Sequence, residues 1–166
     1  MQVFAAGRDS RRHVDEAAQI WAEATAARDG DDEVASLEFS RPIIENVLDR
    51  SPRSVLLVAC CKDGTVSGFA AVEPVEGPGG NRAEVSYFGV RPDMWGNGIG
   101  RALLTALPPY LKAAGYSYAE LSVYVNNIRA TALYEHLGWL PRDAPTSHPR
   151  TGKPEQRYEL RLTDAL

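Results

Sequence analysis

The sequence has few cysteines and little excess charge of either sign. Its 166 residues include 2 cysteines, and 18 basic residues stand against 22 acidic ones. Neighbouring residues of a strand point to opposite faces, so Cys60 and Cys61 are poorly placed to pair with each other or to share a metal ion. A net charge of -4 offers no basic surface for the phosphates of nucleic acid. We therefore expect no metal site and no nucleic-acid partner.

Long apolar runs are also missing. No stretch approaches the ~20 apolar residues of a membrane helix. Residues 1–12 lack the apolar core of ~7–15 residues that a signal peptide needs. These absences predict a cytoplasmic protein that does not enter a membrane. Internal repeats and low-complexity linkers are absent too, so the length predicts one domain, residues 1–166.

Hydrophobic periodicity divides the chain into helices and strands. Helical spacing marks residues 14–27, 37–48 and 128–137, and a further helix should follow Gly98, with Pro108 and Pro109 kinking or restarting it. The segment between residues 141 and 154, rich in Pro, Thr and Ser, has the composition of a loop. Alternating or continuous apolar runs predict strands at residues 3–6, 54–61, 66–72, 83–90, 118–125 and 156–162. The expected fold is α/β (α+β), a mixed sheet with helices on its faces.

A glycine-rich turn joins the strand at residues 83–90 to the following helix. It reads Trp-Gly-Asn-Gly-Ile-Gly-Arg over Trp95–Arg101. Amides at the start of a helix have no intrahelical partner, and glycine lets an anion approach them closely. No lysine follows the glycines, which excludes a P-loop, and Arg101 stands where the dinucleotide-binding pattern needs Gly or Ala. Besides the nucleotides held by these two patterns, a turn of this kind can hold a third ligand, the pyrophosphate of coenzyme A.

Here the sequence resembles the GNAT superfamily of N-acyltransferases. Val90–Leu104 is similar to the family's Gln/Arg-x-x-Gly-x-Gly/Ala segment, although Trp95 stands where Arg or Gln is usual. The segment Asn127–Trp139 is similar to the family's Asn-x-x-Ala-x-x-x-Tyr-x-x-x-Gly-Phe. The resemblance runs from about residue 83 to residue 139. It implies a single GNAT-like domain whose mostly antiparallel sheet has about six to seven strands, flanked by about four helices.

The resemblance also implies acetyl-CoA as cosubstrate and a set of residues that contact it. Because Trp95 lacks a cationic or amide group, backbone amides or Arg101 would hold the pyrophosphate. Asn127 is expected to touch the cofactor, to cap its helix, or to do both. The expected cofactor-binding residues are Phe88, Gly89, Val90, Trp95, Gly96, Asn97, Gly98, Ile99, Gly100, Arg101, Asn127, Ala130 and Tyr134.

Two residues are candidates for proton transfer. Tyr134 occupies the position at which the family has a tyrosine near the sulfur of coenzyme A, so it is the candidate acid; helical spacing alone is typical of a core aromatic. Glu84, early in its strand, is the candidate base, and the alternative is an exposed residue paired across the sheet. Trp21, Ser86 and Tyr87, together with Glu84, are candidates for lining the acceptor's path.

The expected reaction is direct attack of a primary amine, of a small molecule or a peptide, on the acetyl thioester in a ternary complex. The acidic cluster at residues 31–33 favours a cationic acceptor. Two alternatives stay open: a non-catalytic acyl-CoA-binding regulatory module, and an enzyme that uses a longer acyl-CoA. Family members are often dimers, and the resemblance allows a homodimer here.

Overall fold

The computed structural model describes residues 1–75 and 80–162, so residues 76–79 and 163–166 of the predicted domain lie outside the described part. Seven strands form one mixed sheet in the order β1-β2-β3-β4-β5-β7-β6. The strands are β1 (Gln2–Ala5), β2 (Val55–Cys60), β3 (Val66–Pro74), β4 (Arg82–Val90), β5 (Tyr118–Tyr124), β6 (Leu140–Ser147) and β7 (Pro154–Arg161). The pairing of β4 with β5 is parallel, and every other pairing is antiparallel. This is the expected fold class.

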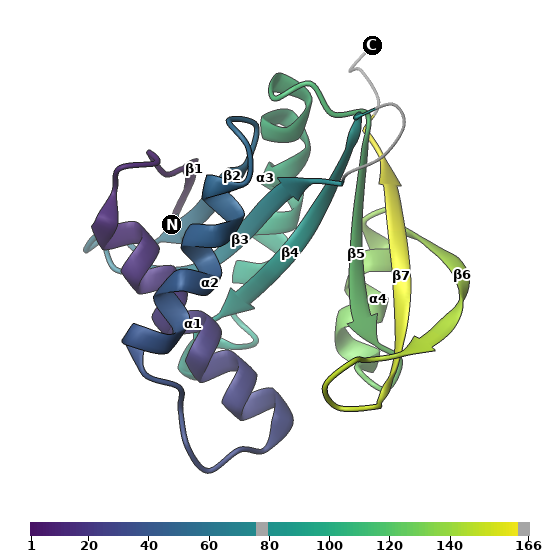
Figure 1. Cartoon of the computed structure of the whole chain (residues 1–166), viewed down its shortest axis with the longest axis horizontal. Helices are drawn as coiled ribbons and strands as arrows, with labels where there is room; N and C mark the ends of the chain where they lie inside the picture. Colours follow the sequence, from purple (N-terminus) through teal and green to yellow (C-terminus); the bar gives the residue numbers. More distant parts are fainter. Residues whose placement is uncertain (76–79, 163–166) are drawn as a thin grey trace.

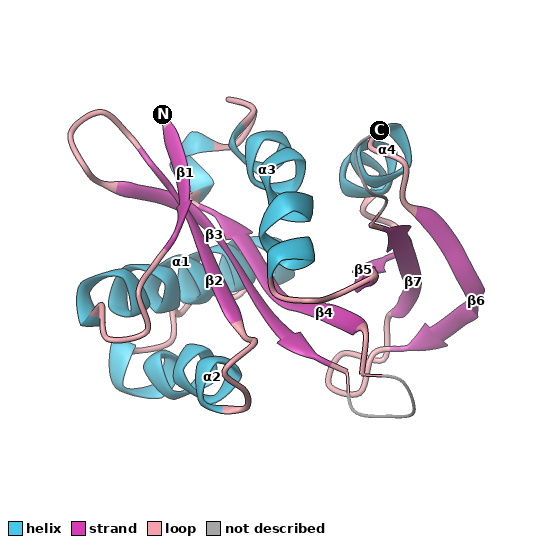
Figure 2. Ribbon diagram, turned by 90° about the horizontal axis from the view of Figure 1, so that it is seen from above, coloured by secondary structure: helices cyan, strands magenta, loops and turns pink. Residues whose placement is uncertain are grey.

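Helices cover both faces of the sheet, as Figures 1 and 2 show. One face carries α1 (Arg11–Asp29) and α2 (Leu37–Asp49), which pack on β2 and β3 through Val14, Ile44 and Phe69. The other face carries α3 (Ile99–Ala113) and α4 (Ile128–His136). A short 3-10 helix, η1 (Pro92–Met94), stands between β4 and the glycine turn. The four helices match the predicted number.

Most predicted elements agree with the structure to within a few residues, but one prediction is wrong. Residues 141–154 are not all loop, because β6 pairs with β7 and forms the edge of the sheet. Its eight residues are all exposed, so it has no apolar alternation, and an edge strand tolerates Pro141 and Pro145. At Pro108 and Pro109, where the sequence predicts a kink or a restart, α3 does not restart but continues to Ala113.

The strands β4 and β5 diverge from one end, and Figure 1 shows them as the two arms of a V. Only three pairs of residues join them: Arg82 with Tyr118, Ala83 with Ala119, and Glu84 with Glu120. Beyond these pairs β4 continues to Val90 and β5 to Tyr124 without contact through the backbone ladder. The sheet is therefore open at its centre, between the unit β1–β4 and the unit β5–β7–β6.

A bulge in β4 lies directly after its last pair with β5. Ala71 pairs with Tyr87 and Val72 pairs with Val85, so Ser86 is an extra residue without a partner on β3. A bulge interrupts the alternation of side chains and bends its strand. As a result Val85 packs in the cluster beneath α3, while Tyr87 packs against the cluster beneath α1. The bulge thus turns β4 at the point where the sheet opens.

No helix of the described residues is long and apolar enough to cross a membrane.

The closest packing between sheet and helix predicts a large effect of one methyl group. A Cβ on Gly68 of β3 would lie 3.0 Å from side-chain atoms of Ile99 and Leu103 and 3.1 Å from the backbone oxygen of Gly89. Because overpacking costs roughly 1–3 kcal/mol, Gly68→Ala should lower the free energy of unfolding by about that amount in urea titrations. Gly7→Ala, whose Cβ would meet no atom within 4 Å, is the matched control. Equal stability of the two variants would contradict this packing.

Candidate functional site

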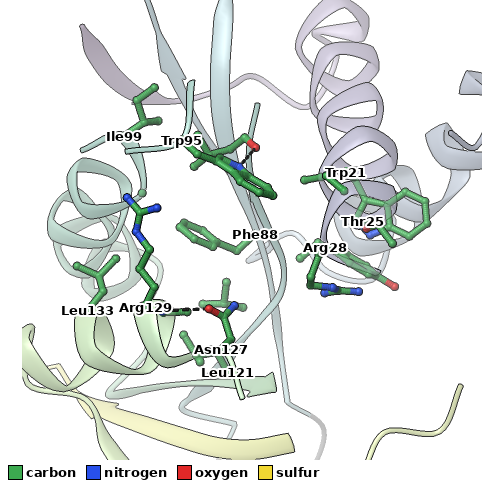
Figure 3. A pocket seen from close by; sticks show the side chains of 18 of the residues that line it. Trp21, Thr25, Arg28, Phe88, Trp95, Ile99, Leu121, Asn127, Arg129 and Leu133 are labelled. Atoms are coloured by element: carbon green, nitrogen blue, oxygen red, sulfur yellow. Dashed lines mark hydrogen bonds between the residues drawn. The ribbon is translucent and has the colours of Figure 1, made fainter. Parts of the chain in front are cut away.

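A cavity of about 870 Å³ occupies the opening between β4 and β5. In Figure 3, Trp21, Thr25 and Arg28 of α1 stand on one side, while Ile99, Arg129 and Leu133 of α3 and α4 stand on the other. Residues 85–90 of β4 line the cavity, as do Leu121 and Tyr124 of β5. A second cavity of about 470 Å³ shares nine lining residues with the first, so the two form one cleft.

The glycine turn closes one end of this cleft. Gly96 and Gly98 have φ angles of 85° and 78°, in the left-handed region that favours glycine, and Gly98 is the N-cap of α3. The first backbone amide to bond within the helix is that of Ala102, which donates to the carbonyl of Gly98. The amides of the preceding helical residues are therefore free to bind an anion at the positive end of the helix dipole.

The side chain of Trp95 bends back onto β4. Its indole Nε1–H donates to the carbonyl of Val90 over 2.8 Å, and its side chain is 47% exposed (Figure 3). Asn97 stabilises the same turn by donating from Nδ2 to the carbonyl of Met94. Trp95 therefore fixes the entry to the glycine turn and supplies no charge to it.

Arg129 of α4 brings a cation to the turn. Its Nη2 lies 3.3 Å from the position that a Cβ on Gly96 would occupy. Within the described residues Arg129 makes no ion pair or hydrogen bond, and it lines the larger cavity. Arg101 lines the cavity as well, with Nη2 3.1 Å from Nε2 of His136. Arg129 is not among the residues predicted from the sequence, although its place two residues after Asn127 was a signal that could have identified it.

The other expected cofactor residues gather in the same cleft, with two exceptions. Asn127 caps α4, since its Oδ1 accepts from the amide of Ala130 over 3.2 Å, and it also lines both cavities. Asn97 and Tyr134 line neither cavity. The residues that do line the larger cavity are Phe88, Gly89, Val90, Trp95, Gly96, Gly98, Ile99, Gly100, Arg101, Asn127 and Ala130.

Tyr134 is packed in the core beside the cleft. Its ring centroid is 6.1 Å from that of Trp139 and 6.0 Å from that of Tyr158. Only 6% of the residue is exposed, and burial raises its pKa to about 12. The phenol therefore stays protonated at neutral pH, but it holds the proton more tightly than an exposed tyrosine with a pKa near 10.

Glu84 lines the smaller cavity, at the end of the β4–β5 pairing. Burial raises its pKa above the ordinary value; the nearby Arg157 opposes this shift, while Glu120 and Glu73 add to it. Glu84 belongs to a row of glutamates that are cross-strand partners on four adjacent strands: Glu73, Glu84, Glu120 and Glu159. The other three have arginine partners, and Glu84 has none among the described residues.

The remaining candidate residues stand near Glu84. Trp21 and Tyr87 line both cavities, with their rings edge to face and centroids 6.1 Å apart. Ser86, the bulge residue, also lines both, and its buried Oγ has no hydrogen-bond partner in the part of the chain that the structure describes. The acidic residues 31–33 contribute to neither cavity. Among the described residues no group of His, Cys, Asp and Glu could hold a metal ion.

Comparison with known proteins agrees with this geometry. Residues 15–139 match the model of the Acetyltransferase (GNAT) family. A mycothiol acetyltransferase of Propionibacterium freudenreichii subsp. shermanii is 38% identical over 84 residues, which are 51% of this chain and 27% of that protein. The match to the mycothiol acetyltransferase of Renibacterium salmoninarum is 32% over 107 residues, 62% of this chain and 32% of the relative. The chain thus spans about a third or less of these curated relatives.

Solved structures share the fold. The crystal structure of a putative phosphinothricin N-acetyltransferase has a TM-score of 0.80 at 20% identity, covering 98% of this chain and 99% of its own. A putative acetyltransferase from Salmonella typhimurium, solved with its cofactor acetyl-CoA, has a TM-score of 0.73 at 19% identity, covering 99% and 95%. At this identity the likeness concerns the fold.

The position of Arg129 predicts its contribution to anion binding. Replacing it with glutamine removes one charge-assisted contact, worth about 1.5–3 kcal/mol, so Arg129→Gln should raise the Kd of coenzyme A roughly tenfold or more in calorimetric titrations. The affinity should become less sensitive to salt as well, because one cation is lost. Arg161→Gln, at an exposed site on β7 outside both cavities, is the control. If both variants bind coenzyme A like the wild type, Arg129 has no such role.

Proposed function

Because the chain belongs to the acetyltransferase (GNAT) family, we propose that it transfers an acetyl group from acetyl-CoA to a primary amine. One observation carries this proposal: a single cleft joins an anion-binding turn, unpaired strand backbone and a carboxylate with a raised pKa. The relatives support acetyl transfer, since their names describe acetyltransferases.

The residues of the larger cavity fit coenzyme A in three respects. Free amides at the start of α3, together with Arg129, match the charge of a pyrophosphate. The unpaired edge of β4 offers backbone groups to the amides of the pantetheine arm, as in strand addition. Phe88, Ile99 and Leu121 give the cavity an apolar wall for the rest of that arm. The bound acetyl-CoA would supply the activated thioester carbonyl.

The acceptor amine would enter from the smaller cavity. A lysine-like amine has a pKa of about 10.4, so only about one molecule in a few thousand is neutral at pH 7. Glu84, directly or through water, takes up the amine's proton. The nitrogen forms a bond to the thioester carbonyl carbon as the carbon–sulfur bond breaks, and the departing thiolate gains a proton. Holding both reactants in one cleft supplies up to ~7–11 kcal/mol of the rate enhancement.

One observation favours a second candidate, a non-catalytic acyl-CoA-binding module. Tyr134 lines neither cavity and has no hydrogen-bond partner for its hydroxyl among the described residues. A module would need the glycine turn and Arg129 but no proton-transfer groups. The sequence leaves a further alternative, an enzyme that transfers an acyl group longer than acetyl. Assays with acyl-CoAs of increasing chain length separate this alternative from acetyl transfer.

Glu84 should control the acid side of the pH profile. Burial raises the pKa of the Glu84 carboxyl above its ordinary value of 4.5. A base must be deprotonated to act, so kcat should rise as the pH passes upward through this raised pKa. Glu84→Gln should lower kcat on the order of 100-fold and remove this limb of the profile. The control is Glu73→Gln on β3, the cross-strand partner of Glu84, which lines neither cavity. Its kcat should match that of the wild type, with the limb moved to slightly lower pH because Glu73 adds to the raised pKa of Glu84. Wild-type kcat in Glu84→Gln would exclude Glu84 as the base.

Tyr134 is tested by removing its hydroxyl alone. Tyr134→Phe keeps the ring between Trp139 and Tyr158, so the thermal unfolding midpoint should hardly change. If Tyr134 protonates the thiolate, kcat should fall on the order of 100-fold while the Kd of acetyl-CoA stays within about twofold. Unchanged kcat would remove Tyr134 from the mechanism. Binding of acetyl-CoA with no turnover of any amine by the wild type would favour the module.

A further inference from the structure

Three arginines from distant parts of the sequence line the smaller cavity. Arg28 lies near the end of α1, Arg150 in the turn between β6 and β7, and Arg157 on β7. Two carboxylates, Glu84 and Glu155, line it as well. The chain as a whole carries a net charge of -4, so this concentration of guanidinium groups at the acceptor end of the cleft is a local feature.

Buried carboxylates hold these arginines in place from behind. Asp29, whose side chain is 7% exposed, accepts from Nε of Arg28 over 2.9 Å and from Nη2 of Arg150 over 2.8 Å. Glu120, with a side chain 6% exposed, accepts from Nη1 of Arg157 over 2.5 Å. The three arginine side chains are 41–59% exposed. Since a guanidinium has five N–H donors, each arginine keeps donors for a molecule in the cavity.

The turn that carries Arg150 is fixed over the cavity. His148 and Lys153 close it with a backbone hydrogen bond of 2.8 Å, and the hydroxyls of Thr151 and Tyr124 are 3.2 Å apart. Nδ1 of His148 accepts from the amides of Arg150 and Thr151. The proton of the neutral ring is therefore on Nε2, and His148 also lines the smaller cavity. Arg28 stacks over the ring of Tyr124, 4.8 Å from its centroid, and both residues line the same cavity.

We propose that the acceptor is an amine that also carries a carboxylate, an amino-acid-like zwitterion. The inference rests on the proposed function and names its substrate class. Arg150 and Arg157 hold the carboxylate through charge-assisted hydrogen bonds, and the amine faces Glu84. A purely cationic acceptor would leave the remaining donors of Arg150 and Arg157 without an acceptor, and the acidic residues 31–33 that suggest such a substrate line neither cavity.

The test compares each of a panel of L-amino acids with its own amide as acceptor. The amide keeps the amine and the side chain but lacks the negative charge. Because its amine is less basic, a larger fraction of it is neutral near pH 7, so without a carboxylate site it should be the better acceptor. We expect kcat/KM for the best amino acid to exceed that for its amide at least tenfold. Equal use of acids and amides would overturn the inference while leaving acetyl transfer established.

Variants locate the effect. Arg150→Gln and Arg157→Gln should each raise KM for the amino acid roughly tenfold and change KM for the amide less than twofold. Arg157 also lowers the pKa of Glu84, so the change in KM and not in kcat is decisive for that variant. The same Arg161→Gln variant, on the strand that carries Arg157, should behave like the wild type. A preference for acids that survives both cavity substitutions would overturn the inference.

A binding measurement separates this inference from the proposed function. If no acceptor is acetylated, the proposed transfer fails, and calorimetry with the amino acids in the presence of coenzyme A then decides about the arginines. Binding that weakens at least fivefold in Arg157→Gln would support the carboxylate site without catalysis. Absence of binding to the wild type would overturn it.

Discussion

The site depends on the early end of the pairing between β4 and β5. Parallel strands that stayed paired would bury their backbone groups in the ladder and leave no room at the centre of the sheet. Here the pairing ends at Glu84 and Glu120, and the bulge at Ser86 bends β4 away directly afterwards. The strands then expose backbone donors and acceptors to a cavity, and such groups need partners in water or in a ligand. The opening thus creates the binding site and its backbone recognition surface together.

Close packing on both faces of the β1–β4 unit fixes one wall of this opening. A Cβ on Gly89 would lie 3.1 Å from Cε1 of Phe69 and 3.4 Å from Cγ2 of Ile20, so α1 sits directly on β4. On the other face, α3 approaches Gly68 equally closely. The core of the β1–β4 unit therefore fixes one wall of the cleft, and α4 and β5 form the opposite wall. Residues of the two units also contact each other across the cleft: Arg28 stacks over Tyr124, and Asp29 pairs with Arg150.

The sequence predicted the parts of this arrangement that rest on local chemistry. Glycine spacing identified the turn, apolar periodicity identified six of the strands, and Asn127 was correctly given a capping role. The sequence could not reveal β6, because its eight exposed residues, two of them prolines, carry no strand pattern. They form a strand only by pairing with β7. Nor could it bring together Arg28, Arg150 and Arg157, because their proximity is produced by the tertiary fold alone. Residues 31–33 were the more conspicuous charged segment, and the fold leaves them outside the cleft.

The row of four glutamates explains why Glu84 differs from its neighbours. Glu73 lies 3.7 Å from Arg50, Glu120 binds Arg157 at 2.5 Å, and Glu159 lies 3.1 Å from Arg82. An ion pair favours the charged form of a carboxyl, whereas burial without a partner favours the neutral form. Glu84 is the member at the edge of the opening, where no arginine of the described chain pairs with it, so its pKa rises. A carboxyl that holds a proton more readily is a better base near neutral pH, and the open sheet brings that property to the smaller cavity, where we propose that the amine enters.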